Sequence, residues 1–319
     1  MNIAKRLAPL AAFGPLLALV AACVFFATQT DRFLSGANLS LILQQITVVG
    51  ALAIGQTLVI LTAGIDLSCG MVMALGIIVM SKFAADYHLP VALAIACGIG
   101  ACILFGLING LLVTRVRLPP FIVTLGTLNI AFAITQLYSH AQTVTDIPDA
   151  LTALGNTFGI GHTTVTYGVV VMLLLYLVTW WALRDTAPGR HVYAVGNNPE
   201  AARLTGIPTQ RVLLVVYGLA GLLYGIAAVL SVARTGVGDP QAGQTENLDS
   251  ITAVVLGGTS LFGGRGGVVG TLIGALIVGV FRNGLTLMGV ASVYQILITG
   301  ILVILAVATD QLSRKGGGR

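Results

Sequence analysis

Long apolar runs recur along almost the whole chain and alternate with short polar stretches. A run of roughly 20 apolar residues is long enough to cross a bilayer as a helix. Ten candidate crossings follow, at 8–27, 41–62, 65–83, 90–113, 121–138, 164–183, 213–233, 251–263, 267–287 and 290–309. The eighth, 251–263, is too short for a full span, so we expect it to be broken or re-entrant. The pattern predicts an all-α polytopic membrane protein whose spans contact membrane lipid.

Composition excludes an ordinary soluble domain. Of the 319 residues, 56% are apolar and only 8% are charged, whereas soluble domains carry about 25% charged residues. Ten spans leave only loops and short ends, so we expect residues 1–319 to form a single transmembrane domain. This argues against an anchored enzyme whose chemistry takes place outside the bilayer. An apolar run after Lys5 and Arg6 resembles a lipoprotein signal ending at Cys23, but it continues through Ala27 and is expected to stay as a span.

Basic residues predict the orientation. With a cytoplasmic N-terminus, ten spans return the C-terminus to the same side, and the cytoplasmic segments then hold twelve of the sixteen Lys and Arg residues. These twelve are Lys5, Arg6, Arg115, Arg117, Arg184, Arg190, Arg203, Arg211, Arg265, Arg314, Lys315 and Arg319. The net charge of +5 therefore reflects topology and does not indicate nucleic-acid binding.

Two connecting stretches are long enough to have structure of their own. The polar stretch 139–163 is expected outside and the basic stretch 184–212 inside. Connections between bundle helices are usually shorter than the inner stretch. It is therefore either a solvated connector or, as we favour, a docking surface.

The inner stretch contains signals for a short helix. Asn198 can cap it, Pro199 fits the first helical position, and Glu200 complements the positive helix start. Arg203 lies near the expected helix end, and Gly206 is a stop signal. A short helix at the cytoplasmic surface is therefore predicted.

Two segments of the chain resemble each other. GACILFGLINGLL at 100–112 and GALIVGVFRNGLT at 274–286 share six residues without gaps. The topology gives the two segments opposite directions across the membrane, so a true repeat would be inverted, a recurring plan in transporters. The repeat halves would be about 41–138 and 213–309.

A polar segment, 62–68, interrupts the second and third apolar runs. Gly64 can break the helix, and Asp66 or Ser68 can satisfy backbone groups that the break frees. A charged Asp in the bilayer needs a partner or a water-filled cavity. Asp66 is therefore either a cap of the third helix at the inner interface or part of a path through the membrane.

Amides and hydroxyls are frequent within the predicted spans. Such groups suit a path for a neutral, polyhydroxylated solute, but they can equally tie helices together. The candidates for a path or a helix break are Gln56, Asp66, Ser68, Asn109, Thr124, Thr127, Asn129 and Asn283.

No motif in the chain supplies chemistry of its own. There is no Gly-rich nucleotide-binding loop, no nucleophile–base constellation, and no pair of histidines placed for a metal site or a proton relay. We expect no enzyme activity, no metal and no cofactor in this chain. If a solute is pumped, the energy must enter through another subunit; a secondary carrier or passive channel is the alternative.

Four segments carry a resemblance to a known family. They are GIDLSCGMVMAL (64–75), NGLLVTRVRLPPFIVTLGT (109–127), GRHVYAVGNNPEAARLTGI (189–207) and AVVLGGTSLFGGRGGVVGTLIGALIVGVFRNGL (253–285). With them, the chain resembles the permease subunit of the ribose-type bacterial ATP-binding-cassette sugar importers. Cys69-Gly70-Met71 departs from the family pattern of small residues, which limits inference about the local helix break.

The resemblance implies partners and roles. Such permeases lie in the cell inner membrane, pair with a second permease copy, dock cytoplasmic ATPases that use ATP and Mg, and receive a monosaccharide from a periplasmic sugar-binding protein. By resemblance, the helix that docks the ATPase comprises Asn198, Pro199, Glu200, Ala201, Ala202, Arg203 and Gly206. Stretches 139–163 and 239–249 would face the binding protein. A permease for branched-chain amino acids or nucleosides is the alternative within the same superfamily.

Overall fold

The computed structural model of the protein describes residues 14–161 and 163–301, together with residues 304 and 308. The start of the predicted first span and the end of the predicted tenth lie outside these residues. The helices are α2 Gly14–Gln29, α3 Gly36–Leu61, α4 Cys69–Ala85, α5 Val91–Leu111, α6 Pro120–Ser139, α7 Asp149–Thr152, α8 Tyr167–Asp185, α9 Ala187–Asn197, α10 Pro199–Leu204, α11 Thr209–Thr235, α12 Glu246–Leu256 and α13 Val268–Leu287. An apolar helix, Ser292–Ile301, follows.

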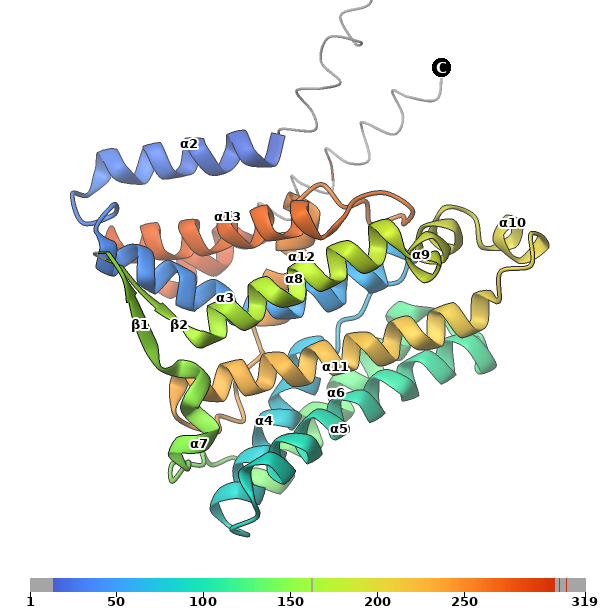
Figure 1. The fold of residues 1–319 in the computed structure, drawn as a ribbon, viewed down its shortest axis with the longest axis horizontal. Helices are drawn as coiled ribbons and strands as arrows, with labels where there is room; N and C mark the ends of the chain where they lie inside the picture. Colours follow the sequence, from blue (N-terminus) through green and yellow to red (C-terminus); the bar gives the residue numbers. More distant parts are fainter. Residues whose placement is uncertain (1–13, 162, 302–303, 305–307, 309–319) are drawn as a thin grey trace, which may run out of the picture.

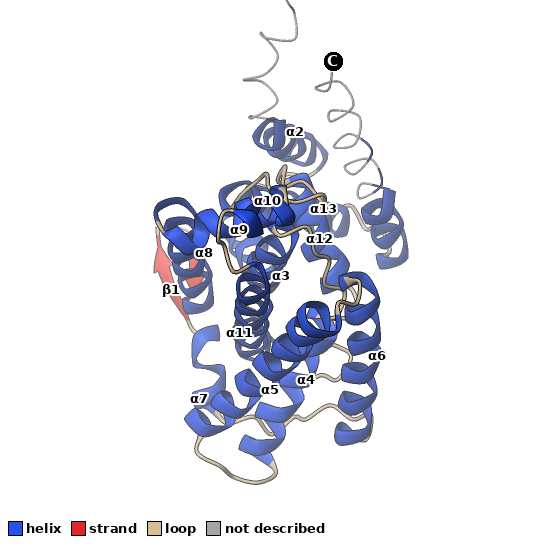
Figure 2. Ribbon diagram, turned by 90° about the vertical axis from the view of Figure 1, so that its right-hand side faces the viewer, coloured by secondary structure: helices blue, strands red, loops and turns tan. Residues whose placement is uncertain are grey.

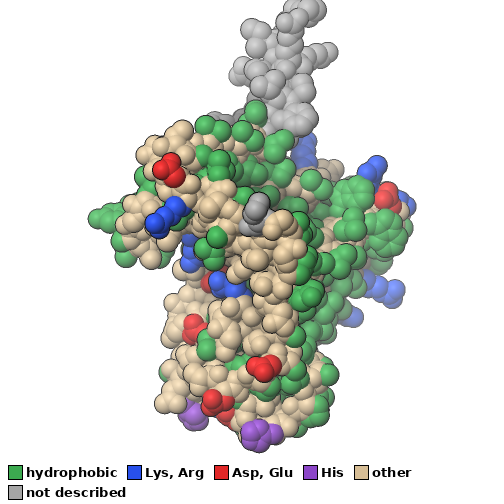
Figure 3. All heavy atoms as spheres, turned by 60° about the vertical axis from the view of Figure 1, so that its left-hand side comes forward, with side chains coloured by type: hydrophobic (Ala, Val, Ile, Leu, Met, Phe, Trp, Pro, Cys, Tyr) green, Lys and Arg blue, Asp and Glu red, His purple; other side chains and the backbone are tan. Residues whose placement is uncertain are grey.

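Six helices in the described part of the chain are long and apolar enough to cross a membrane. They are α3, α5 with its π-helical extension to Val116, α6, α8, α11 and α13, whereas α2, α4 and Ser292–Ile301 are shorter apolar helices. Hydrophobic side chains form a broad band along the right-hand flank in Figure 3, and Leu104, Leu174 and Leu177 on the helix flanks are more than half exposed. Such an apolar exterior fits lipid as its solvent. The prediction of a helical, polytopic membrane protein is confirmed.

The long helices run side by side, and the short elements cap the two ends (Figure 1). We name the end at α9 and α10, to the right in Figure 1, the α10 end. The opposite end, at α7 and the two strands, is the hairpin end. Figure 2 places α3 and α11 near the centre of the molecule, where α11 packs against α3 and α5. Glycines allow close contact there: Gly55 lies against the ring of the fully buried Tyr224.

The predicted break between the second and third spans is present. Helix α3 ends at Leu61, and Thr62 turns its hydroxyl back to donate to the carbonyl oxygen of Val59 (2.8 Å). Ala63 then adopts a left-handed φ of 60°, which a helix cannot continue through. Helix α4 starts at Cys69, so the expected start of the third span at residue 65 was wrong by four residues.

Two short strands, which the sequence did not predict, interrupt the helical fold at the hairpin end. Strand β1, Thr157–Ile160, pairs antiparallel with β2, Thr163–Thr166. The backbone N–H of Thr164 also donates to the hydroxyl of Ser40 on α3 (2.9 Å). The predicted sixth span began at residue 164, but its helix begins at Tyr167. The β-branched residues Thr163–Thr166 favour the extended strand.

The eighth apolar segment is a short helix followed by an irregular chain. Helix α12 has 11 residues and ends at Leu256, and no helix is present between Gly257 and Gly267. The glycines Gly258, Gly263, Gly264 and Gly266 have positive φ there. The expectation that no single helix would cross at 251–263 is therefore met, although α12 begins earlier, at Glu246.

Candidate functional site

Helix α10 has the caps that the sequence predicts. The side-chain oxygen of Asn198 accepts hydrogen bonds from the backbone N–H groups of Glu200 (3.1 Å) and Ala201 (2.9 Å). Pro199 occupies the first turn, and Gly206, two residues beyond the helix, has a φ of 87°. A capped start and a glycine stop stabilise the two ends of a helix that is otherwise too short to be stable. The prediction of this helix is confirmed.

Within the described residues, the charged side chains of Glu200 and Arg203 on α10 pair only with each other. The Arg203 guanidinium donates two hydrogen bonds to the Glu200 carboxylate, of 2.6 and 3.2 Å. These bonds lower the pKa of the Glu200 carboxyl. Both side chains are exposed, and Leu204 is 75% exposed. Only Ala202 turns inward and is buried. The exposed surface of α10 therefore carries one leucine and one charged pair.

Helix α9 was not predicted. Its N-cap is Thr186, whose hydroxyl accepts a hydrogen bond from the N–H of Gly189 (3.2 Å), and Pro188 lies in its first turn. The threonine followed by Ala187 and Pro188 is a helix-start signal that the sequence reading missed. The inner stretch therefore holds two consecutive helices where one was expected.

Helix α9 connects α10 to the body of the protein. Its Gly196 packs so closely on the end of α3 that a Cβ at this position would overlap the carbonyl oxygen of Leu61. The same carbonyl accepts a hydrogen bond from the N–H of Gly264 (2.9 Å). In addition, the Tyr193 hydroxyl donates to the carbonyl oxygen of Gly266 (3.0 Å). Helix α9, which directly precedes α10, therefore contacts both the end of α3 and stretch 257–267.

Directly beyond Leu61, a buried polar cluster fills the break between α3 and α4. One carboxylate oxygen of Asp66 accepts hydrogen bonds from the N–H (2.8 Å) and the hydroxyl (2.6 Å) of Ser68. Its other oxygen accepts one from the Tyr224 hydroxyl on α11 (3.1 Å). The amide nitrogen of Gln56 donates to the carbonyl oxygen of Asp66. Asp66 thus closes the turn before α4 and also ties it to α3 and α11.

Two further helices join the same cluster. The Asn109 amide on α5 donates to the Ser68 hydroxyl (3.0 Å) and accepts from the Thr127 hydroxyl on α6 (2.7 Å). The Thr124 hydroxyl donates to the carbonyl oxygen of Ile65 (3.1 Å). Helices α3, α5, α6 and α11 therefore meet at one break, through side chains that sequence reasoning had selected separately.

Six of the eight candidate path residues belong to this cluster, and two do not. Asn129 is exposed on α6, and among the described residues its amide donates only to the carbonyl oxygen of Leu125 on the same helix (2.9 Å). Asn283 on α13 forms a reciprocal amide pair with Asn38 on α3 (2.9 and 3.0 Å). In the cluster itself no side chain is more than 4% exposed. In this conformation its polar groups bond to one another and to backbone rather than line an open passage.

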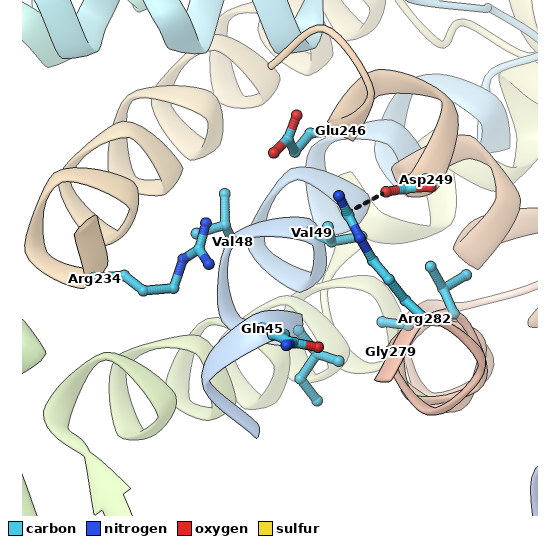
Figure 4. A pocket seen from close by; sticks show the side chains of 11 residues that line it. Gln45, Val48, Val49, Arg234, Glu246, Asp249, Gly279 and Arg282 are labelled. Carbon is cyan, nitrogen blue, oxygen red and sulfur yellow. Dashed lines mark hydrogen bonds and ion pairs between the residues drawn. The ribbon is translucent and has the colours of Figure 1, made fainter. Parts of the chain in front are cut away.

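A second group of charged residues was not anticipated as a site. Arg282 on α13 donates to Asp249 on α12 (3.0 Å), beside a cavity of about 200 Å³ that Arg234 and Glu246 also line (Figure 4). The sequence held a usable signal, because a lone arginine inside an apolar span needs a partner. The partner, Asp249, lies on α12 just before the predicted eighth segment, in stretch 239–249, which had been expected to face the binding protein.

Comparison with known proteins decides the family. The model described as "Branched-chain amino acid transport system / permease component" matches residues 38–307. The chain is 48% identical to the fructose import permease protein FrcC of Rhizobium meliloti, over 94% of this chain and 85% of that protein. It is 41% identical to the ribose import permease protein RbsC of Escherichia coli K12, over 92% of both chains.

This chain belongs to that permease family.

The expected resemblance to ribose-type sugar permeases is thereby confirmed. A third relative, the D-allose transport system permease protein AlsC of Escherichia coli K12, is 35% identical over 94% of this chain. In this permease, parts of the four segments that carried the resemblance come together around the end of α3. Segment 64–75 covers most of the break and the start of α4, 109–127 the junction of α5 and α6, 189–207 most of α9 with α10, and 253–285 the end of α12, stretch 257–267 and most of α13.

Proposed function

We propose that this chain is the transmembrane permease subunit of an ATP-driven importer that carries a monosaccharide across the inner membrane. The observation that carries the proposal is the near full-length similarity to permeases named for fructose, ribose and allose import. The solute class is a ribose-like pentose, a hexose or a polyol. The choice among these rests mainly with the binding protein that delivers the solute.

The proposed membrane arrangement is a single domain over residues 1–319 with ten crossings and both termini in the cytoplasm. Besides the six long helices, the crossings are α2, α4, the helix from Ser292, and α12 continued by 257–267. The basic residues support a cytoplasmic α10 end. They lie in the π-helical extension of α5 or just after it, in the last turn of α8, in α9, in the first turn of α11 and just before α13, namely Arg115, Arg117, Arg184, Arg190, Arg211 and Arg265.

An inverted repeat belongs to the same proposal, with halves of about 41–138 and 213–309. Its support is reciprocal packing: α11, the first helix of the second half, packs on α5, and α3, the first of the first half, packs on α13. Under the repeat α3 corresponds to α11 and α5 to α13, so one contact is the image of the other.

Helix α10 is the proposed contact with the ATPase. The residues are Asn198, Pro199, Glu200, Ala201, Ala202, Arg203 and Gly206, and the exposed Leu204 joins them. ATP and Mg would bind only in the ATPase, so this chain would be neither an enzyme nor a cofactor protein. Because α9 packs on Leu61, closure of the ATPase would move the end of α3 and the break behind it.

The opposite end is the proposed receiving surface for a periplasmic sugar-binding protein. The described residues of stretch 139–163, namely 139–161 and 163, and residues 239–249 lie at or near the hairpin end, away from α10. A second copy of the permease would complete the path, and lipid would cover the apolar flanks. Gln56, Asp66, Ser68, Asn109, Thr124 and Thr127 are proposed to form the hinge at the α3 break that opens when α10 moves.

Reconstitution in liposomes tests the proposed function. We expect uptake of D-fructose or D-ribose only when the permease, a partner ATPase, the binding protein and ATP are all present. Uptake by the permease alone, driven by a gradient and indifferent to ATP, would instead identify a secondary carrier or channel.

A branched-chain amino-acid permease is the second candidate, because the matching family model carries that description. Competing solutes separate the two. Excess D-fructose or D-ribose should block uptake, whereas excess L-leucine or a nucleoside should leave it unchanged. Competition by L-leucine would favour the amino-acid function.

A further inference from the structure

A charged cavity lies between α3, α11, α12 and α13, apart from the cluster at Asp66. Its volume is about 200 Å³, and Gln45, Arg234, Glu246, Asp249 and Arg282 line it. Figure 4 shows these polar side chains around one central space, with Arg234 and Arg282 approaching from opposite sides, Glu246 above and Gln45 below. Apolar side chains, including Val48 and Val49, complete the wall.

The charges in this cavity balance. Two guanidinium groups face two carboxylates, so the lining carries no excess charge. Asp249 is held by Arg282 at 3.0 Å, and Glu246 accepts hydrogen bonds from the N–H of Gly243 (3.0 Å) and the hydroxyl of Thr245 (3.3 Å). Both carboxylates are therefore fixed in place while oxygen lone pairs remain available as acceptors.

Two lining groups lack partners. Within the part of the chain that the structure describes, no hydrogen bond or salt bridge engages the Arg234 guanidinium. The side-chain oxygen of Gln45 is buried and accepts no hydrogen bond. Polar groups held without partners beside a cavity indicate that a ligand or water completes them.

We propose that this cavity holds a neutral, polyhydroxylated solute of monosaccharide size on its way through the permease. Hydroxyl groups both donate and accept, so they satisfy the guanidinium, the carboxylates and the amide together. The balanced charge gives no advantage to an ionic solute. The volume is smaller than the roughly 300–1,000 Å³ of pockets for drug-sized ligands, and the valine wall suits the C–H face of a sugar ring.

The position of the cavity indicates the side from which it fills. Gln45 lies in the first half of α3, Arg234 in the last turn of α11, Glu246 at the start of α12, and Arg282 near the end of α13. These helix portions all point to the hairpin end, opposite α10. The inference rests on the proposed function: a sugar released at the hairpin end would reach this cavity before the break at Asp66.

Binding without the binding protein tests the cavity directly. The full permease with its ATPase, in lipid nanodiscs, is titrated with D-fructose, D-ribose, L-leucine and D-gluconate, and binding is followed by saturation-transfer NMR. The sugars should give signals, and L-leucine and gluconate should not. Arg234→Gln, which removes no hydrogen bond or salt bridge to a described residue, should weaken sugar binding at least about tenfold, and Gln45→Leu should weaken it as a second, independent variant.

Arg32→Gln is the matched control, because Arg32 is an exposed arginine near the start of α3 whose side chain makes no hydrogen bond to a described residue. This variant should bind sugar like the unmodified protein. Any of three results would overturn the cavity assignment. The unmodified complex could give no sugar signal, the Arg234→Gln and Gln45→Leu variants could bind sugar as tightly as the unmodified protein, or L-leucine could bind.

Uptake measured in the same preparations separates the two proposals. ATP-driven sugar uptake that Arg234→Gln leaves unchanged contradicts the cavity assignment and leaves the proposed function standing. Absence of ATP-driven sugar uptake in the complete unmodified system contradicts the proposed function, whatever the cavity binds.

Discussion

Two polar regions at the α10 end of this permease behave as opposites. On α10, the exposed side chains of Glu200 and Arg203 pair with each other, and no other described residue pairs with either side chain. At the α3 break, Asp66 and Ser68 are fully buried and bond directly to neutral side chains from three helices, α3, α5 and α11. Exposed ion pairs contribute little stability, whereas a buried acceptor that is removed leaves its donors unsatisfied. Substitutions should therefore affect docking in the first region and folding in the second.

Loss of the Asp66 carboxylate is the strongest test of that contrast. Asp66→Ala leaves three donors buried without an acceptor, the N–H and hydroxyl of Ser68 and the hydroxyl of Tyr224. Each costs about 1–3 kcal/mol, so the free energy of unfolding should fall by several kcal/mol and little monodisperse protein should be recovered in detergent. Tyr224→Phe, which removes one donor only, should be much milder. A normal melting temperature for Asp66→Ala would show that the cluster does not hold the break.

A substitution at the contact between α9 and the end of α3 should have the next largest effect. Gly196→Ala places a methyl group against the carbonyl oxygen of Leu61, and such overpacking costs about 1–3 kcal/mol. We expect the ATPase to remain bound while ATP-driven uptake falls severalfold, because α9 can no longer pack closely against the end of α3. Gly126→Ala on α6, where a methyl group meets no atom within 4 Å, is the control and should transport normally. Equal uptake by the two variants would break the proposed link between α10 and the break.

Charge reversal on α10 should affect assembly without affecting the fold. Glu200→Arg or Arg203→Glu creates a like-charge pair on an exposed helix, so the melting temperature should stay nearly constant while ATPase co-purification falls severalfold. The double variant with both Glu200→Arg and Arg203→Glu restores the intrahelical pair. It therefore separates loss of the pair from loss of each charge at its own position. If the double variant restores assembly, the pair matters only for the helix; if assembly stays weak, the individual charges contact the ATPase.

The cap of α10 gives the smallest expected effect. Asn198→Ala removes the acceptor for the N–H groups of Glu200 and Ala201, which should cost about 1 kcal/mol of local helix stability. Uptake should fall about twofold to fivefold, which corresponds to that energy. Asn198→Asp keeps a capping oxygen and should behave like the unmodified protein. Loss of uptake in both variants would argue for a direct contact of the amide rather than capping.

Local signals in the sequence were enough for part of this picture. Apolar runs of membrane length placed the long helices, and the cap at Asn198 with the stop at Gly206 placed α10. Each of these features depends on residues close together in the chain. The break at 62–68 was likewise readable, because Gly64, Asp66 and Ser68 follow one another inside an apolar region.

Features set by distant contacts were missed. The pair of Asp249 with Arg282 joins residues 33 positions apart, and the bond of Tyr224 to Asp66 spans 158. The strand Thr163–Thr166 is stabilised by pairing with β1 and by Ser40, which an average over an apolar window cannot detect. Asn129 and Asn283 were predicted by residue type as candidates for a path or a helix break, but Asn129 faces outward on α6 and Asn283 pairs with Asn38 on α3.

Photo-crosslinking from α10 is the most direct test of the central claim. The claim is that an ATPase binds α10 and thereby moves the end of α3. A photoreactive amino acid at Leu204, 75% exposed, should crosslink to the ATPase, and the yield should change on addition of ATP. The same group at Ile160, 59% exposed in the hairpin, should give no such product. ATPase crosslinks from Ile160 but not from Leu204 would contradict the account.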